Sequence, residues 1–312
     1  MYKLRIAFLG TPEFAIPSLN QCIESGELVS VITQPDKERG RGKKVQYTFI
    51  KQEALKHDLE VFQPKSIKSE SSIKYLKSLN LDLMVVVAYG QILSKEVLNI
   101  PKYGCINVHA SLLPKLRGAA PINWAIVNGD KVTGVTTMKM DVGLDTGDML
   151  GKIEVKIDEF MNAGELHDIL MVEGAKVLKQ TLKEIENDEL NPVAQDNSIF
   201  TYAPMMNKKM AIIDWNDTAR NIHNLIRGFN PWPVAYTVYK DKKVKIYESE
   251  VIDLNYNKNN GEIVEVAENG IVVQTNDKCL LIKKIQFPNK KSVLVKSFLN
   301  GNDIELGVVL GG

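Results

Sequence analysis

The strongest constraint on the fold is an alternation, over the first half of the chain, of short apolar runs with amphipathic segments. The apolar runs have the length of buried strands and cover residues 4–9, 28–33, 59–62, 83–88 and 105–109. The segments between them have helical spacing and cover residues 17–25, 47–57, 71–79 and 121–127. Such alternation predicts βαβ units around a mostly parallel sheet. Two further strands, 132–140 and 149–157, and a long amphipathic helix, 163–187, are expected next.

The pattern changes between residues 189 and 208, where Pro192, Asn197, Pro204 and several polar residues interrupt the periodicity. We interpret this stretch as a linker. Beyond it we expect one helix over 218–227. Short alternating segments then cover residues 234–239, 244–251, 261–267, 270–275 and 279–285. That spacing is typical of a small antiparallel barrel. The sequence therefore predicts an α/β domain over residues 1–189, a linker over 190–207 and a barrel domain over 208–312.

Composition excludes several classes of protein. The 312 residues carry a net charge of only +1. The net charge therefore gives no indication that the protein binds nucleic acid. Residues 207–312 hold 15 basic and 12 acidic residues, which is a mild excess. The three cysteines are scattered without a Cys-x-x-Cys pair, and the four histidines form no His-Glu-x-x-His motif. We therefore expect no disulfide framework, no metal and a reducing cytoplasm. No signal peptide or membrane-length apolar run is visible, so no membrane partner is expected.

Two polar residues end the fifth apolar run, Cys105-Ile106-Asn107-Val108-His109. Residues two apart on a strand face the same side, so Asn107 and His109 point together where the strand gives way to a loop. In open α/β sheets, ligands bind at that edge. An Asn amide can donate a hydrogen bond to a developing oxyanion, and a His can move a proton. The alternative is a histidine that only bonds backbone at the strand end.

A later loop, residues 141–148, carries three carboxylates and two glycines in the order Asp-Val-Gly-Leu-Asp-Thr-Gly-Asp. The glycines permit close backbone approach. A carboxylate here can orient His109 and favour its protonated form. An acidic surface turn is the alternative, since the spacing does not fit an EF-hand.

Three other segments carry weaker signals. Residues 36–44 hold five basic and two acidic residues, and the loop is long for a strand–helix connection. It suits contacts to the phosphates of a polyanion, with a solvated surface loop as the alternative. The turn Gly10-Thr11-Pro12 lacks the glycines of a dinucleotide-binding loop, which argues against a nicotinamide enzyme. In Asn230-Pro231-Trp232-Pro233, the indole of Trp232 either stacks on a base or anchors domain packing.

Together these motifs resemble those of the folate-dependent formyltransferases. The resemblance runs in order through residues 10–12, 39–44, 85–90, 107–114, 117–122, 141–148 and 229–233. Asn-x-His-x-Ser-Leu-Leu-Pro followed by Leu-Asp-Thr-Gly is specific to this group. The Arg-Gly-Arg-Gly-Lys-Lys loop and the Asn-Pro-Trp-Pro motif narrow the resemblance to the methionyl-tRNA formyltransferase family. No motif position departs from the pattern.

The resemblance implies a Rossmann-like domain followed by an OB-like β-barrel. It also implies transfer of the formyl group of 10-formyltetrahydrofolate to the α-amino group of methionine on initiator methionyl-tRNA, for translation initiation. The catalytic residues it implies are Asn107, His109 and Asp145. The folate-binding segment it implies is Ser111, Leu112, Leu113 and Pro114. The tRNA-binding residues it implies are Arg39, Arg41, Lys43 and Lys44.

Two other functions remain open at this point. One is another formyltransferase or a hydrolase that uses 10-formyltetrahydrofolate with a small-molecule acceptor. The basic loop and the barrel argue against a small acceptor. The other is a non-catalytic RNA-binding protein on the same two domains, against which the intact Asn107, His109 and Asp145 argue.

Overall fold

The computed structural model describes residues 3–39 and 44–311, and contacts divide the chain into two compact units. Unit 1 comprises Met1–Ala119, Thr133–Lys156 and His167–Ala203. Unit 2 comprises Ala120–Val132, Ile157–Leu166 and Pro204–Gly312. Within the described ranges, none of the helices combines the length and apolar character needed to cross a membrane.

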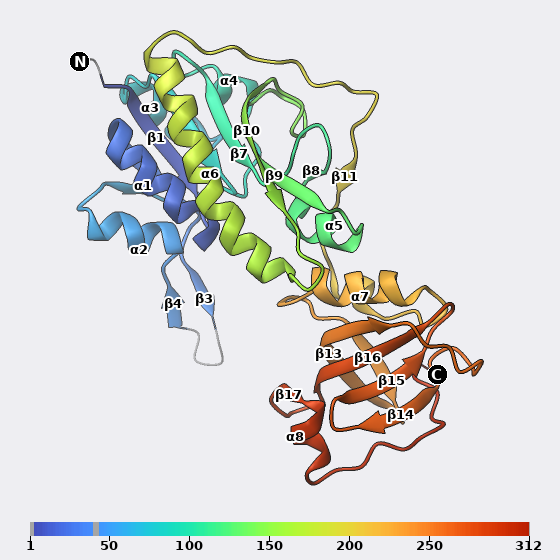
Figure 1. Ribbon diagram of the computed structural model, residues 1–312. Coiled ribbons are helices and arrows are strands. Elements are labelled where there is room, and N and C mark those ends of the chain that lie inside the picture. Colours follow the sequence, from blue (N-terminus) through green and yellow to red (C-terminus); the bar gives the residue numbers. More distant parts are fainter. Residues whose placement is uncertain (1–2, 40–43, 312) are drawn as a thin grey trace. The chain divides into compact units, whose positions relative to one another are not determined.

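Unit 1 is built on a seven-stranded sheet with the order β10-β9-β7-β6-β1-β2-β5 (Figure 1). Its strands are β1 (Arg5–Gly10), β2 (Glu27–Ile32), β5 (Val61–Phe62), β6 (Leu83–Val87), β7 (Cys105–His109), β9 (Val132–Lys139) and β10 (Met149–Lys156). The five strands from β5 to β7 pair in parallel, and β9 pairs antiparallel with β7. The predicted mostly parallel α/β sheet is therefore confirmed.

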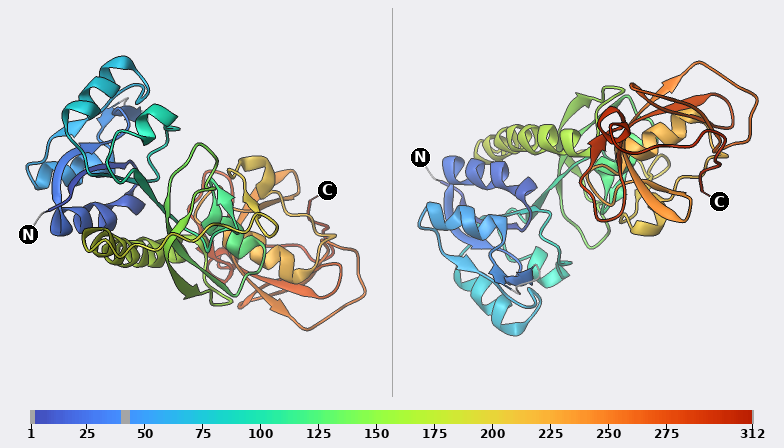
Figure 2. Two further views of the ribbon diagram at one scale, coloured as in Figure 1. Left: turned by 90° about the horizontal axis from the view of Figure 1, so that it is seen from above. Right: turned by 90° about the horizontal axis from the view of Figure 1, so that it is seen from below.

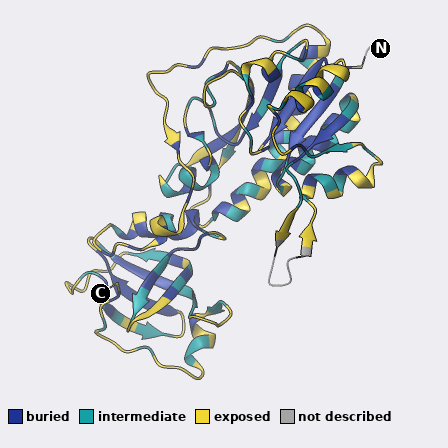
Figure 3. Cartoon of the chain, turned by 180° about the vertical axis from the view of Figure 1, so that it is seen from behind, coloured by how far each residue is buried: buried dark blue, intermediate teal, exposed yellow. Residues whose placement is uncertain are grey.

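Helices connect these strands and cover the sheet. They are α1 (Ile16–Ser25), α2 (Phe49–Lys56), α3 (Glu70–Ser78), α4 (Lys95–Leu98) and α6 (Ala163–Glu186), with a short 3-10 turn, η1 (Glu13–Ala15). Leu76 of α3 and Val97 of α4 share an apolar cluster with Leu9 of β1. On the other face, a Cβ on Gly174 of α6 would lie 3.1 Å from Val108, so the helix packs closely there. Helices α1 and α6 lie side by side in Figure 1 and in both views of Figure 2. The strands between these layers are the buried part of the unit (Figure 3).

Two short pairings in unit 1 were not predicted. Strands β3 (Lys37–Arg39) and β4 (Lys44–Gln46) form an antiparallel hairpin inside the segment expected to be a long loop. Strands β8 (Arg117–Gly118) and β11 (Tyr202–Ala203) pair in parallel. Strand β11 lies in the stretch that we interpreted as a linker, whereas β8 lies in the predicted α/β domain.

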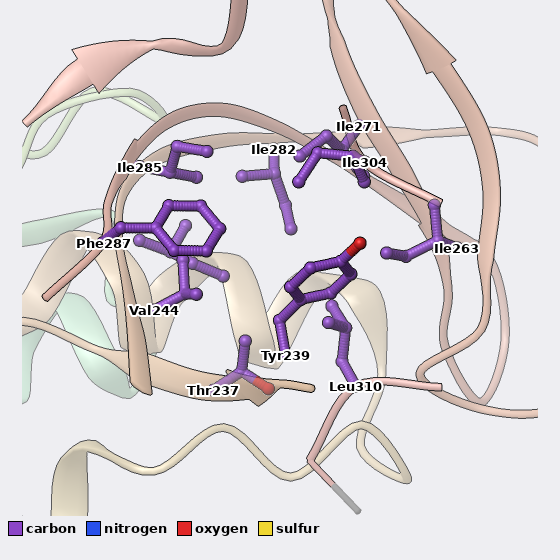
Figure 4. A pocket seen from close by; sticks show the side chains of 11 residues that line it. Thr237, Tyr239, Val244, Ile263, Ile271, Ile282, Ile285, Phe287, Ile304 and Leu310 are labelled. Atoms are coloured by element: carbon purple, nitrogen blue, oxygen red, sulfur yellow. The ribbon is translucent and has the colours of Figure 1, made fainter. Parts of the chain in front are cut away.

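Unit 2 contains a curled antiparallel sheet with the order β12-β13-β16-β15-β14, and β17 pairs with β16. Its elements are α5 (Pro121–Val127), η2 (Lys208–Ala211), α7 (Ala219–Gly228), β12 (Tyr236–Tyr239), β13 (Lys242–Ile252), β14 (Ile263–Ala267), β15 (Gly270–Gln274), β16 (Cys279–Gln286), β17 (Val293–Leu294) and α8 (Val295–Leu299). Register shifts on either side of Glu248 bend β13. Apolar side chains such as Ile263, Ile282 and Phe287 fill the inside of the curl (Figure 4). This half-barrel confirms the prediction of a small antiparallel barrel-like fold in the second part of the chain.

Helices α5 and α7 complete the core of unit 2. Ile222 and Ile226 of α7 lie in the same apolar cluster as Ile246 of β13, and Trp124 and Val127 of α5 pack against that cluster. Helix α5 therefore belongs to the core of unit 2, although it lies far from the barrel in sequence.

Candidate active site

The carboxyl end of β7 carries Asn107 and His109 on one face of the strand. Asn107 Nδ2 lies 3.5 Å from Asp145 Oδ1, and His109 Nδ1 lies 3.7 Å from Asp145 Oδ2. The structure thus brings together the three residues that the resemblance implied. They meet at the sheet edge where ligands bind in open α/β folds.

A backbone hydrogen bond holds one side of the His109 ring. Its Nε2 lies 3.0 Å from the backbone oxygen of Leu116, and the residue is 6% exposed. A carbonyl oxygen only accepts hydrogen bonds, so Nε2 carries a proton. Nδ1 is therefore the atom that can gain or lose a proton, and it faces Asp145. The backbone bond expected as an alternative is therefore present, and the other nitrogen of the same ring faces Asp145.

The loop that carries Asp145 is tightly constrained. Asp145 has a φ of 53°, in the left-handed region that disfavours most side chains. Its Oδ2 accepts a hydrogen bond of 2.8 Å from the backbone N–H of Gly118. A Cβ on Gly147 would lie 1.7 Å from the backbone oxygen of Lys139, so only glycine fits at that position.

The segment implied to bind folate follows β7 directly. Ser111 is fully buried, and its Oγ donates to the backbone oxygen of Lys115 at 2.7 Å. Leu113 is also buried, and its N–H donates to Thr136 Oγ1 at 3.2 Å. Leu112 and Pro114 are half-buried, so they retain side-chain surface for a ligand.

The chain matches the family model described as formyl transferase over residues 4–182 and the formyl transferase C-terminal domain over residues 205–303. It is 52% identical, over 308 residues, to the methionyl-tRNA formyltransferase of Clostridium beijerinckii, covering 98% of this chain and 100% of that protein. Identity to the same enzyme of Clostridium perfringens SM101 is 54% over 308 residues, with the same coverage. The chain belongs to the methionyl-tRNA formyltransferase family. The fold is shared with a sugar 3N-formyltransferase, whose crystal structure was determined in the presence of dTDP and 5-N-formyl-THF. The TM-score is 0.69 and the sequence identity 22%, and the match covers 93% of this chain and 100% of that one.

The basic hairpin of this methionyl-tRNA formyltransferase family member is only partly described. The backbone of Arg39 in β3 lies opposite that of Lys44 in β4 in the antiparallel register. Arg41 and Lys43 lie outside the described residues. Within the described ranges, no group of three or more His, Cys, Asp or Glu side chains is arranged to hold a metal ion.

A second basic surface lies on unit 2. Lys243 Nζ sits 3.2 Å from the centroid of the Tyr236 ring. Burial lowers the pKa of Lys243, and the neighbouring charges of Lys245 and Lys208 lower it further. We call Lys208, Lys243 and Lys245 the lysine cluster. In the described part of the chain, none of the three forms an ion pair with a carboxylate.

Sequence reasoning gave no role to Gln195, which contacts the Asp145 loop, or to Arg117, which contacts Gln195. Arg117 Nε donates to Gln195 Oε1 at 3.0 Å, and Gln195 Nε2 donates to the backbone oxygens of Asp145 and Gly147. Arg117 belongs to the matched motif over residues 117–122, but Gln195 lies in the stretch that we interpreted as a linker. No local pattern connects residues so far apart in sequence.

Proposed function

We propose that this protein transfers the formyl group of 10-formyltetrahydrofolate to the α-amino group of methionine on initiator methionyl-tRNA, for translation initiation. The proposal rests on the meeting of Asn107, His109 and Asp145 at the carboxyl end of β7. Sequence identities of 52% and 54% to methionyl-tRNA formyltransferases, over 98% of the chain, support it. We also propose a cytoplasmic location, which the role in translation and the three buried free cysteines support.

The three side chains divide the chemistry between them. When bound, 10-formyltetrahydrofolate supplies an activated formyl carbon whose oxygen gains negative charge as the amine attacks. Asn107 Nδ2 has two N–H bonds, and its contact with Asp145 leaves one to donate to that oxygen. The pair of His109 and Asp145 takes up, at His109 Nδ1, the proton that the attacking amine must lose. The bond between the formyl carbon and the folate nitrogen then breaks, and the proton passes to that nitrogen, so tetrahydrofolate leaves. The bond from His109 Nε2 to Leu116 keeps the ring in this orientation.

The residues around the triad fit a flat heterocyclic donor. Val142 and Leu144, in the loop that carries Asp145, are 73% and 58% exposed. Leu112 and Pro114 add apolar surface directly after β7. Sites for small cofactors combine apolar surface with a few placed polar groups, and these two segments offer apolar side chains next to the polar triad in sequence. We assign the folate to this surface, with Ser111 and Leu113 as packing residues of the same segment.

We assign tRNA binding to two basic surfaces. One is the basic segment over residues 36–44, with Arg39, Arg41, Lys43 and Lys44. The other is the lysine cluster on the barrel domain, residues 208–312, whose three ammonium groups have no carboxylate to neutralise them among the described residues. Bringing phosphates to these ammonium groups relieves their mutual repulsion and releases counterions.

The direct test is formylation of charged initiator tRNA by the purified protein with 10-formyltetrahydrofolate. We expect formyl-methionyl-tRNA as the product, detected after hydrolysis of the ester bond. Parallel reactions receive an amino sugar nucleotide, glycinamide ribonucleotide or no acceptor. Formyl transfer to a small acceptor, or release of free formate, in the absence of transfer to tRNA would replace this proposal with the alternative functions.

A further inference from the structure

Arg117 is a buried cation whose hydrogen-bonding partners are neutral. It is 3% exposed, and its guanidinium donates to Gln195 Oε1 at 3.0 and 2.8 Å and to Asn197 Oδ1 at 2.8 Å. The ring centroid of Phe200 lies 5.1 Å from the guanidinium carbon. Burying a charge that has no ion-pair partner among the described residues is unfavourable, so this arrangement calls for an explanation beyond stability.

The charge of Arg117 determines which way the Gln195 amide points. The amide oxygen must face the guanidinium, because only oxygen can accept its N–H groups. The amide nitrogen then faces the opposite side. There it donates to the backbone oxygens of Asp145 at 2.9 Å and Gly147 at 2.7 Å. The reverse orientation would place the amide oxygen against two carbonyl oxygens.

The same elements hold the Asp145 carboxylate. Gly118, next to Arg117 in β8, donates its N–H to Asp145 Oδ2. The backbone oxygen of Asp145 is held through Gln195, and its carboxylate is held through Gly118. A residue at φ 53° persists only where its surroundings fix it, and these bonds supply that restraint.

We propose that Arg117 and Gln195 are positioning residues that hold Asp145 against His109. This inference rests on the proposed formyl transfer, because it assigns them to the same reaction. They act through Asp145 and touch neither the formyl donor nor the amine. Without the Gln195 hydrogen bonds, the loop relaxes from its disfavoured conformation and the carboxylate moves away from His109 Nδ1. A displacement of about 1 Å at a reacting group costs up to about a hundredfold in rate.

Gln195→Met tests the proposal because methionine has a similar length and no polar amide. We expect kcat for formyl transfer to fall about tenfold to a hundredfold, with little change in KM for tRNA or folate. The decisive comparison is with Asp145→Asn. If Gln195 acts through Asp145, the double variant is no slower than Asp145→Asn alone. If the loss of kcat in the double variant equals the product of the losses in the two single variants, the inference is overturned. Gln180→Met, an exposed glutamine on α6 that bonds Glu184, is the matched control and should keep wild-type kcat.

A second measurement does not depend on activity. The chain has four histidines, so the imidazole NMR signals of His109 can be assigned with a His109→Gln variant. We expect Gln195→Met and Arg117→Lys to move these signals towards their position in Asp145→Asn, since lysine cannot make the two-pronged contact. Unmoved His109 signals in both variants would overturn the inference even if the wild-type protein formylates no tRNA. Absence of transfer by the wild type would count against the proposed function alone.

Discussion

The ring of His109 shows how one backbone contact decides the chemistry of a side chain. Because Leu116 accepts a hydrogen bond at Nε2, proton exchange is confined to Nδ1, the atom that faces Asp145. A histidine with two free nitrogens could present either of them to a substrate. The neutral form of His109 in this fold therefore has one tautomer, with the proton on Nε2 and with Nδ1 facing the Asp145 carboxylate.

Asn107 and His109 should therefore be needed for the chemical step and not for folding. We expect Asn107→Ala to lower kcat about 10²–10³-fold, the usual cost of removing an oxyanion donor. His109→Ala should lower it about 10²–10⁴-fold, the usual range for proton-transfer groups. Steady-state formylation assays with circular dichroism would check both. Near-wild-type turnover in either folded variant would remove that residue from the catalytic assignment.

The same loop contains internal controls for Asp145. Asp145→Asn should lower kcat at least about a hundredfold, because an amide cannot accept a proton. Asp148 is exposed, so Asp148→Asn should retain activity. Asp141 accepts hydrogen bonds from Gly143 N–H and Thr146 Oγ1, so Asp141→Asn should show an intermediate loss through the shape of the loop. A greater loss for Asp148→Asn than for Asp145→Asn would mean that the wrong carboxylate has been chosen.

A buried histidine in unit 2 predicts acid sensitivity. Burial lowers the pKa of His223 from 6.5 to about 4, against the opposing hydrogen bond to the Glu159 backbone. Between these pH values the unfolded chain binds a proton that the folded chain does not. Stability is therefore complete above about pH 6.5 and falls as the pH drops towards 4, by about 3 kcal/mol or less. Thermal midpoints measured across this range should depend less on pH in His223→Gln. An equal flattening in a His57→Gln variant, at an exposed site, would exclude His223 as the source.

Elements governed by local pattern were predictable, and elements governed by distant partners were not. Strand β7 and helix α5 lie where the apolar run and Pro121 placed them, because a short continuous apolar run and a proline at the first helical position are local signals. The pairing of β8 with β11 joins two-residue strands that are distant in sequence, and neither strand has a periodicity of its own. The site followed the same rule. Asn107 and His109 could be inferred from one strand, Asp145 needed the family resemblance, and Gln195 needed the structure.

The β3–β4 hairpin was expected as a loop because its charged residues hide any alternation. Its basic residues still predict a role in binding tRNA. Replacing Arg41, Lys43 and Lys44 together with alanine should raise KM for tRNA several-fold or more and leave folate affinity unchanged. A hairpin that also positions the acceptor end would lower kcat as well. Kinetics at one fixed salt concentration would check this, with Lys176 and Lys179 on α6 as surface controls. An unchanged KM for tRNA would show that these three residues do not contribute to tRNA binding.

The two units of the whole chain are interleaved in sequence. Residues 120–132 and 157–166 belong to unit 2, and α5 packs with α7 in its core. Arg227 of α7 donates to the backbone oxygens of Asp158 and Met161 in the second of these segments. Deleting everything after residue 203 would therefore leave Trp124 and Val127 without the core against which they pack. The contribution of the second domain has to be measured in the full-length protein.

The lysine cluster allows that measurement, because unit 2 also carries a matched set of lysines, two on β16 and one directly before it. Lys278, Lys283 and Lys284 each form an ion pair, with Asp253, Glu250 and Glu248 respectively. A paired lysine brings a carboxylate that repels phosphate, whereas the lysine cluster has no such partner within the described residues.

Replacing Lys208, Lys243 and Lys245 together with alanine should weaken tRNA binding by the full-length protein. The slope of log affinity against log salt should become shallower by up to about one unit for each phosphate that the variant no longer neutralises. Replacing Lys278, Lys283 and Lys284 should change the slope much less, because their charges are already neutralised. Filter binding or fluorescence titration over a salt series would give both slopes. Folate binding should be unaffected in both variants, since the proposed folate surface lies in unit 1. Equal slopes for the two triple variants would mean that the lysine cluster does not touch the tRNA backbone.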